Sequence, residues 1–228
     1  MSYLWQEFNI KTFPAETFIF RDGVFCPELS DYKVGFFKDN EIFINKTSVL
    51  PIHIIYIGEI AGNIELKLNI NAENNKIIMT NKIITKKPAF LNIFIKNAGK
   101  NSVFDGQIIV KNYNELKIDV YGNNNAENTG IFVKTRVAAY KNSETVLNGY
   151  AEIGKNMKNC DSDISFSVMA DKNAKIQLKP TQYINSVPKN AKHSASLYKP
   201  TDNQIQYLRM SGLSGNEIEH VIEEAFLN

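Results

Sequence analysis

Hydrophobic and polar residues alternate along most of this chain, from about residue 40 to residue 185. An alternation with a period of two residues places one set of side chains on a buried face and the other set in solvent, as in a β-strand. The apolar positions are clearest in three segments: Ile64, Leu66, Leu68 and Ile70; Leu116, Ile118 and Val120; and Ile164, Phe166 and Val168. The pattern therefore predicts a body built from many short strands.

The segments between these strands are rich in Asn, Gly, Lys and Asp, for example residues 71–76, 122–128 and 156–159. These residue types favour tight turns. No segment of useful length with a helical period interrupts the region, which argues against parallel strands joined by crossover helices. A sandwich, a barrel and a β-solenoid are all compatible with this pattern.

One internal similarity favours the solenoid among these three architectures. Residues 103–110 (VFDGQIIV) resemble residues 146–153 (VLNGYAEI) at an offset of 43 residues. This offset corresponds to about two coils of roughly 20 residues each, which is within the range of stacked structural repeats. The alternative is a chance similarity between two β-segments. Each coil of a solenoid is half-exposed until a neighbour stacks on it, so both ends need a cover or a partner.

Residues 1–38 differ from the body and are predicted to cover one of its ends. Their aromatic residues form a dense series: Trp5, Phe8, Phe13, Phe18 and Phe20. Residues 20–25 have the pattern of a β-hairpin with an Asp-Gly turn, which residues 27–30 bring to an end.

Residues 198–228 have the pattern of two short helices, which leaves residues 39–197 as the strand-rich core. Each predicted helix begins with a capping box, in which two side chains reciprocally satisfy donors at the helix start. The pairs are Thr201 with Gln204 and Ser214 with Glu217. The apolar residues of each helix lie on one face: Ile205 and Leu208, then Ile218, Val221, Ile222, Ala225 and Phe226. Such a short pair cannot bury these faces alone, so we expect it to pack on the strand body, as a cap for its second end, or on a partner.

Composition narrows the function classes. The chain has 228 residues, of which 43% are hydrophobic, so it can build a core. A net charge of +2, from 26 basic and 24 acidic residues, argues against a nucleic-acid partner. No apolar stretch approaches the ~20 residues that span a bilayer, so no membrane partner is expected. Cys26 and Cys160 are far apart and no signal peptide precedes them, which favours a cytoplasmic location over a disulfide framework.

The sequence shows no phosphate-binding glycine loop, nucleophile elbow or zinc-ligand spacing. Cys160 stands near Asp161 and Asp163, and such groups can ligate a metal, but an isolated cysteine is more often a small buried hydrophobe. Two function classes stay open from the residues alone. One is a β-helix enzyme acting on polysaccharide, which needs converging carboxylates. The other is a structural or adaptor protein without metal.

Several motifs occur along the chain in an informative order. Residues 20–30 (FRDGVFCPELS) and 51–55 (PIHII) are similar to the patterns V-x-V-D-G-x-F-x-P-E-L-S and P-L-H-L-L. Residues 146–149 (VLNG) and Lys179-Pro180 follow, then His193, and residues 207–213 (YLRMSGL) take the place of Y-L-x-S-R-G-I. In this order and spacing, the motifs resemble the SufB/SufD family of iron–sulfur cluster assembly proteins.

The resemblance implies a right-handed β-helix core that pairs with a SufB-like subunit or with a second copy of itself. It also implies that the C-terminal helices dock a SufC-type ABC ATPase, and that this subunit is not itself an enzyme. The partner-binding residues would then be Ile205, Leu208, Ile218, Val221, Ile222 and Phe226. No cofactor is expected to stay bound, although iron or an iron–sulfur cluster would pass through a subunit interface.

Departures from the family patterns favour a SufD-like subunit. The family motif Ser-His-Gly-Ala is replaced by residues 192–195 (KHSA), so the histidine stays while its neighbours change. SufB-type members flank this histidine with glutamates and carry a scaffold cysteine ahead of the Lys-Pro position, where residues 171–174 (DKNA) have no thiol. Imidazole binds iron well, so His193 is the candidate metal ligand, with its other ligands on a partner. The alternative is an exposed histidine that closes the last coil.

Overall fold

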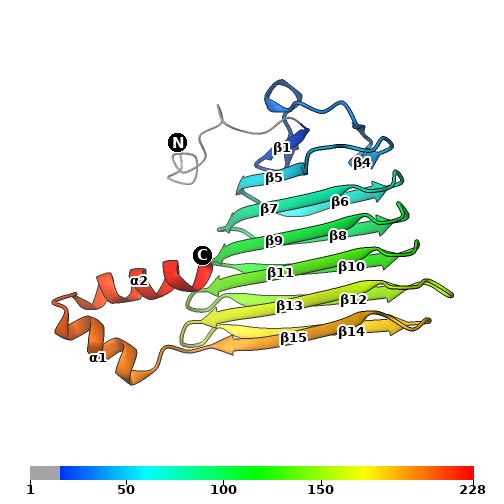
Figure 1. Ribbon diagram of the computed structural model, residues 1–228. Helices are drawn as coiled ribbons and strands as arrows, with labels where there is room; N and C mark the ends of the chain where they lie inside the picture. Colours follow the sequence, from blue (N-terminus) through cyan, green and yellow to red (C-terminus); the bar gives the residue numbers. More distant parts are fainter. Residues whose placement is uncertain (1–15) are drawn as a thin grey trace.

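The computed structural model describes residues 16–228 of the chain. It is mainly β, with 57% of residues in strands, and forms a β-solenoid of about six turns followed by two C-terminal helices (Figure 1). The predicted fold class is therefore confirmed.

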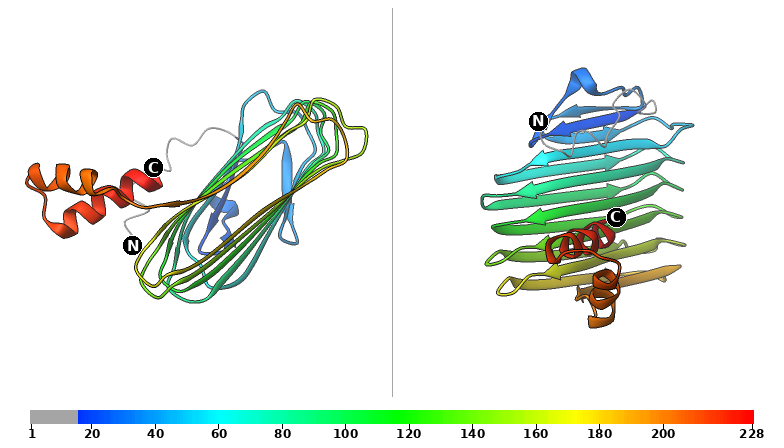
Figure 2. Two further views of the ribbon diagram at one scale, coloured as in Figure 1. Left: turned by 90° about the horizontal axis from the view of Figure 1, so that it is seen from below. Right: turned by 90° about the vertical axis from the view of Figure 1, so that its left-hand side faces the viewer.

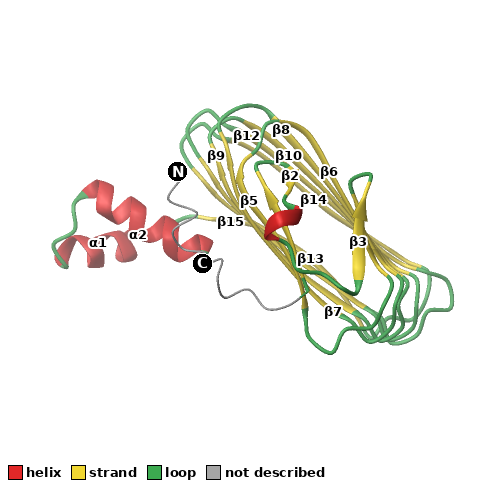
Figure 3. Cartoon of the chain, turned by 90° about the horizontal axis from the view of Figure 1, so that it is seen from above, coloured by secondary structure: helices red, strands yellow, loops and turns green. Residues whose placement is uncertain are grey.

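Within the described residues, the strands form two sheets that face each other along the solenoid. Sheet A consists of β1 (Thr17–Arg21), β2 (Val24–Phe25), β5 (Ile52–Glu59), β7 (Lys76–Thr85), β9 (Val103–Asn112), β11 (Gly130–Ala139), β13 (Asp161–Ala170) and β15 (Asn190–Tyr198). Sheet B consists of β3 (Gly35–Lys38), β4 (Glu41–Ile44), β6 (Gly62–Ile70), β8 (Ala89–Asn97), β10 (Glu115–Asn124), β12 (Glu144–Ile153) and β14 (Lys175–Ile184). From β5 onwards the chain alternates between the sheets and each strand pairs in parallel with the strand one turn away (Figure 3).

The length of one turn differs from the sequence-based estimate. Paired residues on neighbouring strands of sheet A are separated in the sequence by one full turn of the solenoid. Val103 pairs with Gly130, and Gly130 pairs with Asp161, so one turn is longer than the predicted coil of roughly 20 residues. The estimated coil was too short, because the two similar segments lie on opposite sheets. Residues 103–110 belong to β9 in sheet A and residues 146–153 to β12 in sheet B, one and a half turns later.

The two similar segments share an inward-facing glycine that makes room for the core. A Cβ atom at Gly106 would lie 2.7 Å from the ring of Phe104, and one at Gly149 would lie 2.7 Å from Ile164. The space of the missing side chains is thus filled by neighbouring core residues. Any larger side chain would force this packing apart.

The core consists of columns of inward side chains stacked along the solenoid axis. One column of sheet A runs from Ile54 through Met79, Gly106 and Val133 to Ile164, each paired with the next. The alternation predicted from the sequence is confirmed, because Leu116, Ile118, Val120, Ile164, Phe166 and Val168 are all fully buried. Burial of these apolar surfaces is the main force that holds successive turns together.

A ladder of asparagines runs along one edge of the solenoid. Asn74, Asn101, Asn128 and Asn159 each occupy the turn into a sheet A strand and have positive φ angles of 55–59°. Asparagine adopts this left-handed conformation more readily than most residues. The Nδ2 groups of Asn101, Asn128 and Asn159 each donate to Oδ1 of the preceding asparagine in this series, at 3.0, 2.9 and 3.1 Å. The asparagines of the predicted tight turns therefore also link one coil of the solenoid to the next.

The predicted N-terminal hairpin is confirmed. β1 and β2 are antiparallel and are joined by Asp22 and Gly23, both with positive φ, and a 3₁₀ helix (Pro27–Leu29) follows. Phe18 and Phe20 are buried in the core, and β1 also pairs in parallel with β5, so this segment extends sheet A. Trp5, Phe8 and Phe13 lie outside the described residues.

The two helices, α1 (Asp202–Met210) and α2 (Gly215–Leu227), form an arm that projects sideways from sheet A (Figures 1 and 2). Both predicted capping boxes are present at their N-termini. The expectation that the helices cap the far end of the solenoid is wrong, because the arm lies beside the sheets and not over β14 and β15. The reason is the contact that the last turn of α2 makes with sheet A.

Candidate functional site

The arm is attached to the outer face of sheet A through the last residues of α2. Leu227 is 3% exposed and packs against Ile109 and Ala138, while the ring of Phe226 stacks on Tyr198 with centroids 5.2 Å apart. Leu227 is the anchor that sequence reasoning missed. Its only sequence signal was its apolar character at the end of the helix.

Polar contacts surround this apolar anchor. Lys111 Nζ lies 2.6 Å from Glu223 Oε1 and 2.9 Å from Glu224 Oε1, and the Tyr140 hydroxyl donates a hydrogen bond to Glu223. Burial disfavours the charged form of Lys111, but the two glutamates outweigh it and raise the pKa of its ammonium group. Burial and the bond to Glu223 raise the pKa of Tyr140. The helix end is therefore held by charge-assisted hydrogen bonds, the stronger kind.

The six predicted partner-binding residues differ in how far they are exposed. Ile218 and Ile222 are buried, at 4% and 9% exposure, where α2 faces α1 and sheet A. Val221 is 41% exposed, and the remaining three are partly buried: Ile205, Leu208 and Phe226.

Two further apolar side chains of α1 are much more exposed than these. Tyr207 is 71% exposed and Met210 is 81% exposed. Sequence reasoning missed both, although a tyrosine and a methionine on a short helix are typical of contact surfaces. The arm thus uses part of its apolar surface for its own packing and presents the rest to solvent.

The far end of the solenoid, formed by β14 and β15, is the second candidate surface. Both strands are the last of their sheets, so one backbone edge of each has no partner strand within the described residues. Leu197 is 64% exposed although it continues the column of buried Val168, and Ile184, which continues the column of buried Ile153, is 41% exposed. Exposed apolar side chains between two open strand edges form a template for association.

His193 lies on this open end. It pairs with Ile164 and so occupies the next position of an inward-facing column, but it is exposed because no further turn covers it. Beside it, Gln182 Nε2 donates to the carbonyl oxygen of Lys192 at 2.5 Å, which links the two sheets. Among the described residues, no three His, Cys, Asp or Glu side chains gather into a metal site. A metal bound at His193 would therefore need ligands from outside residues 16–228.

Neither cysteine lies on an accessible surface. Cys160 is fully buried, where its Sγ contacts Thr129 Oγ1 at 3.4 Å and donates to the Ala126 carbonyl oxygen at 3.2 Å. Asp161 instead lies on the outside and is engaged by Asn190 at 2.8 Å. Cys26 is also buried, and burial followed by the charge of Glu28 raises the pKa of its thiol.

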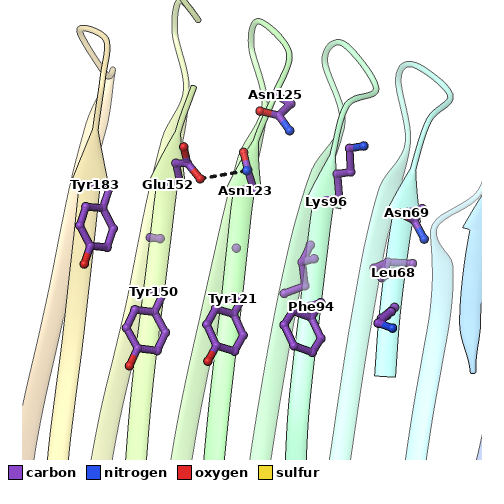
Figure 4. A pocket seen from close by; sticks show the side chains of 14 residues that line it. Leu68, Asn69, Phe94, Lys96, Tyr121, Asn123, Asn125, Tyr150, Glu152 and Tyr183 are labelled. Atoms are coloured by element: carbon purple, nitrogen blue, oxygen red, sulfur yellow. Dashed lines mark hydrogen bonds between the residues drawn. The ribbon is translucent and has the colours of Figure 1, made fainter. Parts of the chain in front are cut away.

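A third surface is a groove of about 710 Å³ on the outer face of sheet B (Figure 4). Phe94, Tyr121 and Tyr150 occupy the same position in successive turns, and their rings stack with centroids 4.7 and 4.8 Å apart. Because the rings cover one another, the groove presents mainly their edges and hydroxyl groups.

Carboxylates do not converge in this groove. Of the described residues that line it, Glu152 alone is acidic, and Asn123 Nδ2 donates to it at 3.0 Å. Asp119, on the same face of sheet B, is engaged by Lys117 at 2.9 Å and by Asn148 at 2.7 Å. A glycosidase needs a pair of carboxyl groups on either side of its substrate, so the groove gives no support to the polysaccharide-acting alternative.

Comparison with known protein families identifies a match. Residues 62–226, well over half of the chain, match the family described as "SUF system FeS cluster assembly, SufBD core domain". The matched segment begins at β6 and ends in the last turn of α2, so it contains the open end of the solenoid and the arm. No curated protein matches the chain. No helix within residues 16–228 is both long and apolar enough to span a membrane.

Proposed function

Because the chain belongs to the SufBD core-domain family and thus has a role in iron–sulfur cluster assembly, we propose that it is a SufD-like, non-catalytic subunit of an assembly complex. The observation that carries this proposal is that the family match extends through the arm to Phe226. The arm and the open solenoid end are then the two surfaces that join this subunit to its partners, and the cluster is the cargo of the complex.

The SufD-like assignment is supported by what stands at the positions of the SufB-type motifs. Residues 171–174 (DKNA) provide no thiol, and Lys192 and Ser194 flank His193 in place of glutamates. Both cysteines of the chain are buried. Thiolates are the usual ligands of iron–sulfur clusters, so the cysteine ligands of a nascent cluster come from a partner subunit, and no cofactor stays bound to this chain.

The open end of the solenoid is the surface for the second β-helix, either a SufB-like subunit or a second copy of this chain. Pairing there covers Leu197 and Ile184 and provides partners for the free edges of β14 and β15. It also places His193 at the interface. In this proposal His193 is an iron ligand shared with the partner, in the cytoplasm, where thiols and iron(II) stay reduced.

The arm is the surface for the SufC-type ABC ATPase. Tyr207, Met210 and Val221 are its large exposed apolar residues, and Leu208 is partly exposed. Exposed aromatic and methionine side chains are enriched in protein interfaces. Their packing against an ATPase removes this apolar surface from water.

Co-expression with SufB-like and SufC-like subunits from the same organism tests the proposal. We expect the three chains to copurify, and we expect the ATPase to be lost when residues 199–228 are removed while the SufB-like chain is kept. A His193→Ala variant should form the same complex but transfer fewer clusters to an apo-ferredoxin. Recovery of this chain without either partner would contradict the proposed function, and unchanged transfer by His193→Ala would remove the histidine from it.

A further inference from the structure

A groove of about 370 Å³ lies where the arm meets sheet A. Its volume falls within the range of about 300–1,000 Å³ that is typical of ligand-binding clefts. Apolar side chains form much of its lining: Ala138, Met169 and Ala170 from sheet A, and Ile205, Ile218 and Ile222 from the arm. The groove is therefore a place where an apolar chain can be covered on several sides.

Charged side chains also line this groove, and most of them are acidic. Glu223 is already held by Lys111 and Tyr140. Asp171, Glu219 and Arg209 form no ion pair with any residue in the described part of the chain. Two free carboxylates against one guanidinium leave an acidic excess, so the groove attracts a cation more than an anion.

The arm as a whole has the same sign. Residues 199–228 contain five acidic and two basic residues, although the whole chain has a net charge of +2. The negative charge is thus concentrated on the element that projects away from the solenoid. Charge complementarity therefore predicts a basic surface on whatever binds the arm.

We propose that this groove receives a long basic side chain, Lys or Arg, from a basic amphipathic segment of the ATPase subunit. The inference rests on the proposed function, and it names the chemistry by which the ATPase is recognised. Long basic side chains bury their methylene groups along apolar surfaces while their charged heads reach polar groups. Here Ile218 and Ile222 cover the methylene groups, and Asp171 and Glu219 bind the charged head.

Isothermal titration of the full-length chain with the ATPase subunit tests the groove directly. The variants Asp171→Lys and Glu219→Lys each replace a free negative charge of the groove by a positive charge. Ala170→Trp instead fills the groove with a large side chain from an exposed position. The control Glu73→Lys makes the same change of charge on an exposed turn far from the arm. We expect each groove variant to weaken binding about tenfold and to reduce its salt dependence, while the control stays within about twofold of the natural sequence.

The outcomes separate this inference from the proposed function. If the natural sequence does not bind the ATPase, both fail. If it binds but the groove variants bind as tightly as Glu73→Lys, the groove assignment alone is overturned. If the groove variants change only the self-association of this chain, the occupant is a second copy and the inference is wrong. Thermal unfolding of each variant establishes that the fold is retained, and Ala170→Trp provides a test that is independent of charge.

Discussion

Lys111 Nζ on β9 lies 2.6 Å from Glu223 Oε1 in the last turns of α2, although the two residues are far apart in the sequence. This ion pair is only partly exposed, at 25% for the lysine side chain and 12% for the glutamate. Together with the buried Leu227, it fixes the arm to the side of the solenoid and keeps it away from the open end. Both proposed interfaces are therefore accessible at the same time.

Replacing Lys111 by Met is expected to loosen the arm without unfolding the solenoid. The variant leaves Glu223 and Glu224 without their cation, and we expect a loss of about 1–2 kcal/mol from the free energy of arm docking. Hydrogen exchange of the amides in residues 222–227 should become about tenfold faster. The control Lys100→Met removes the more exposed ion pair with Glu127 and should leave these amides unchanged. Equal protection in both variants would show that the ion pair does not hold the arm.

Leu227→Ala is expected to weaken arm docking by about 2–3 kcal/mol, because it leaves a cavity beside Ile109 and Ala138. Val221→Ala, on the exposed side of the same helix, should cost less than about 0.5 kcal/mol. Proteolytic cleavage between residues 199 and 214 measures the difference. Similar cleavage rates for the two variants would argue against Leu227 as the anchor.

Arm docking is expected to depend on pH at both ends of the scale. The pKa of Glu224 lies below its ordinary 4.5, mainly because Lys111 donates a hydrogen bond to its carboxylate. The contribution of Glu224 to arm docking is therefore present at neutral pH and is lost as acid protonates the carboxylate. The pKa of Lys111 is raised above 10.5, so its contribution is present at neutral pH and is lost only as the pH rises above that value.

A pair of labels on Asn216→Cys and Lys155→Cys can follow the distance between the arm and the solenoid, since both natural cysteines are buried. The distance should stay constant from about pH 5 to about pH 10 and increase outside that range. A transition near pH 7 would contradict the assignment of docking to these groups.

The asparagine ladder makes a prediction about stability. Asn128 both donates to Asn101 and accepts from Asn159, and its φ angle is 57°. Asn128→Gly should cost about 1 kcal/mol because it loses two exposed hydrogen bonds. Asn128→Ala should cost about 1 kcal/mol more, because alanine is strained at positive φ. Denaturant unfolding measures both values, and equal stability of the two variants would show that the backbone angle does not matter here.

The features that sequence analysis predicted correctly depend on residues close together in the chain. The alternation of Ile64, Leu66 and Leu68 identifies a strand, and Thr201 with Gln204 identifies a helix start, because the contacts involved span a few residues. The turn length could not be obtained in the same way. The number of residues in one solenoid turn depends on pairings between residues far apart in the chain, such as Val103 with Gly130. The loops that connect the strands also vary in length.

The orientation of the arm was not predictable for a related physical reason. The helical period shows that Ile218 and Ile222 share a face, but Lys111, Ala138 and Tyr140 determine which face meets the solenoid. The stacked rings of Phe94, Tyr121 and Tyr150 offered a signal for the turn length that was missed. Tyr121 and Tyr150 are separated by one turn of sheet B, and Phe94 precedes Tyr121 by another turn, so aromatic residues recur at nearly equal spacing.

The affinity of the SufC-type ATPase for this chain is the decisive test of the arm as the ATPase-binding surface. Titration should compare the natural sequence, the double variant Met210→Asp with Val221→Asp, and the control Val49→Asp, which changes a fully exposed apolar residue far from the arm. We predict that the natural sequence and the control bind alike and that the double variant binds at least about a hundredfold more weakly, because charges replace buried apolar contacts. Equal binding by all three proteins, or no binding by the natural sequence, would contradict the claim that the arm joins this subunit to the ATPase.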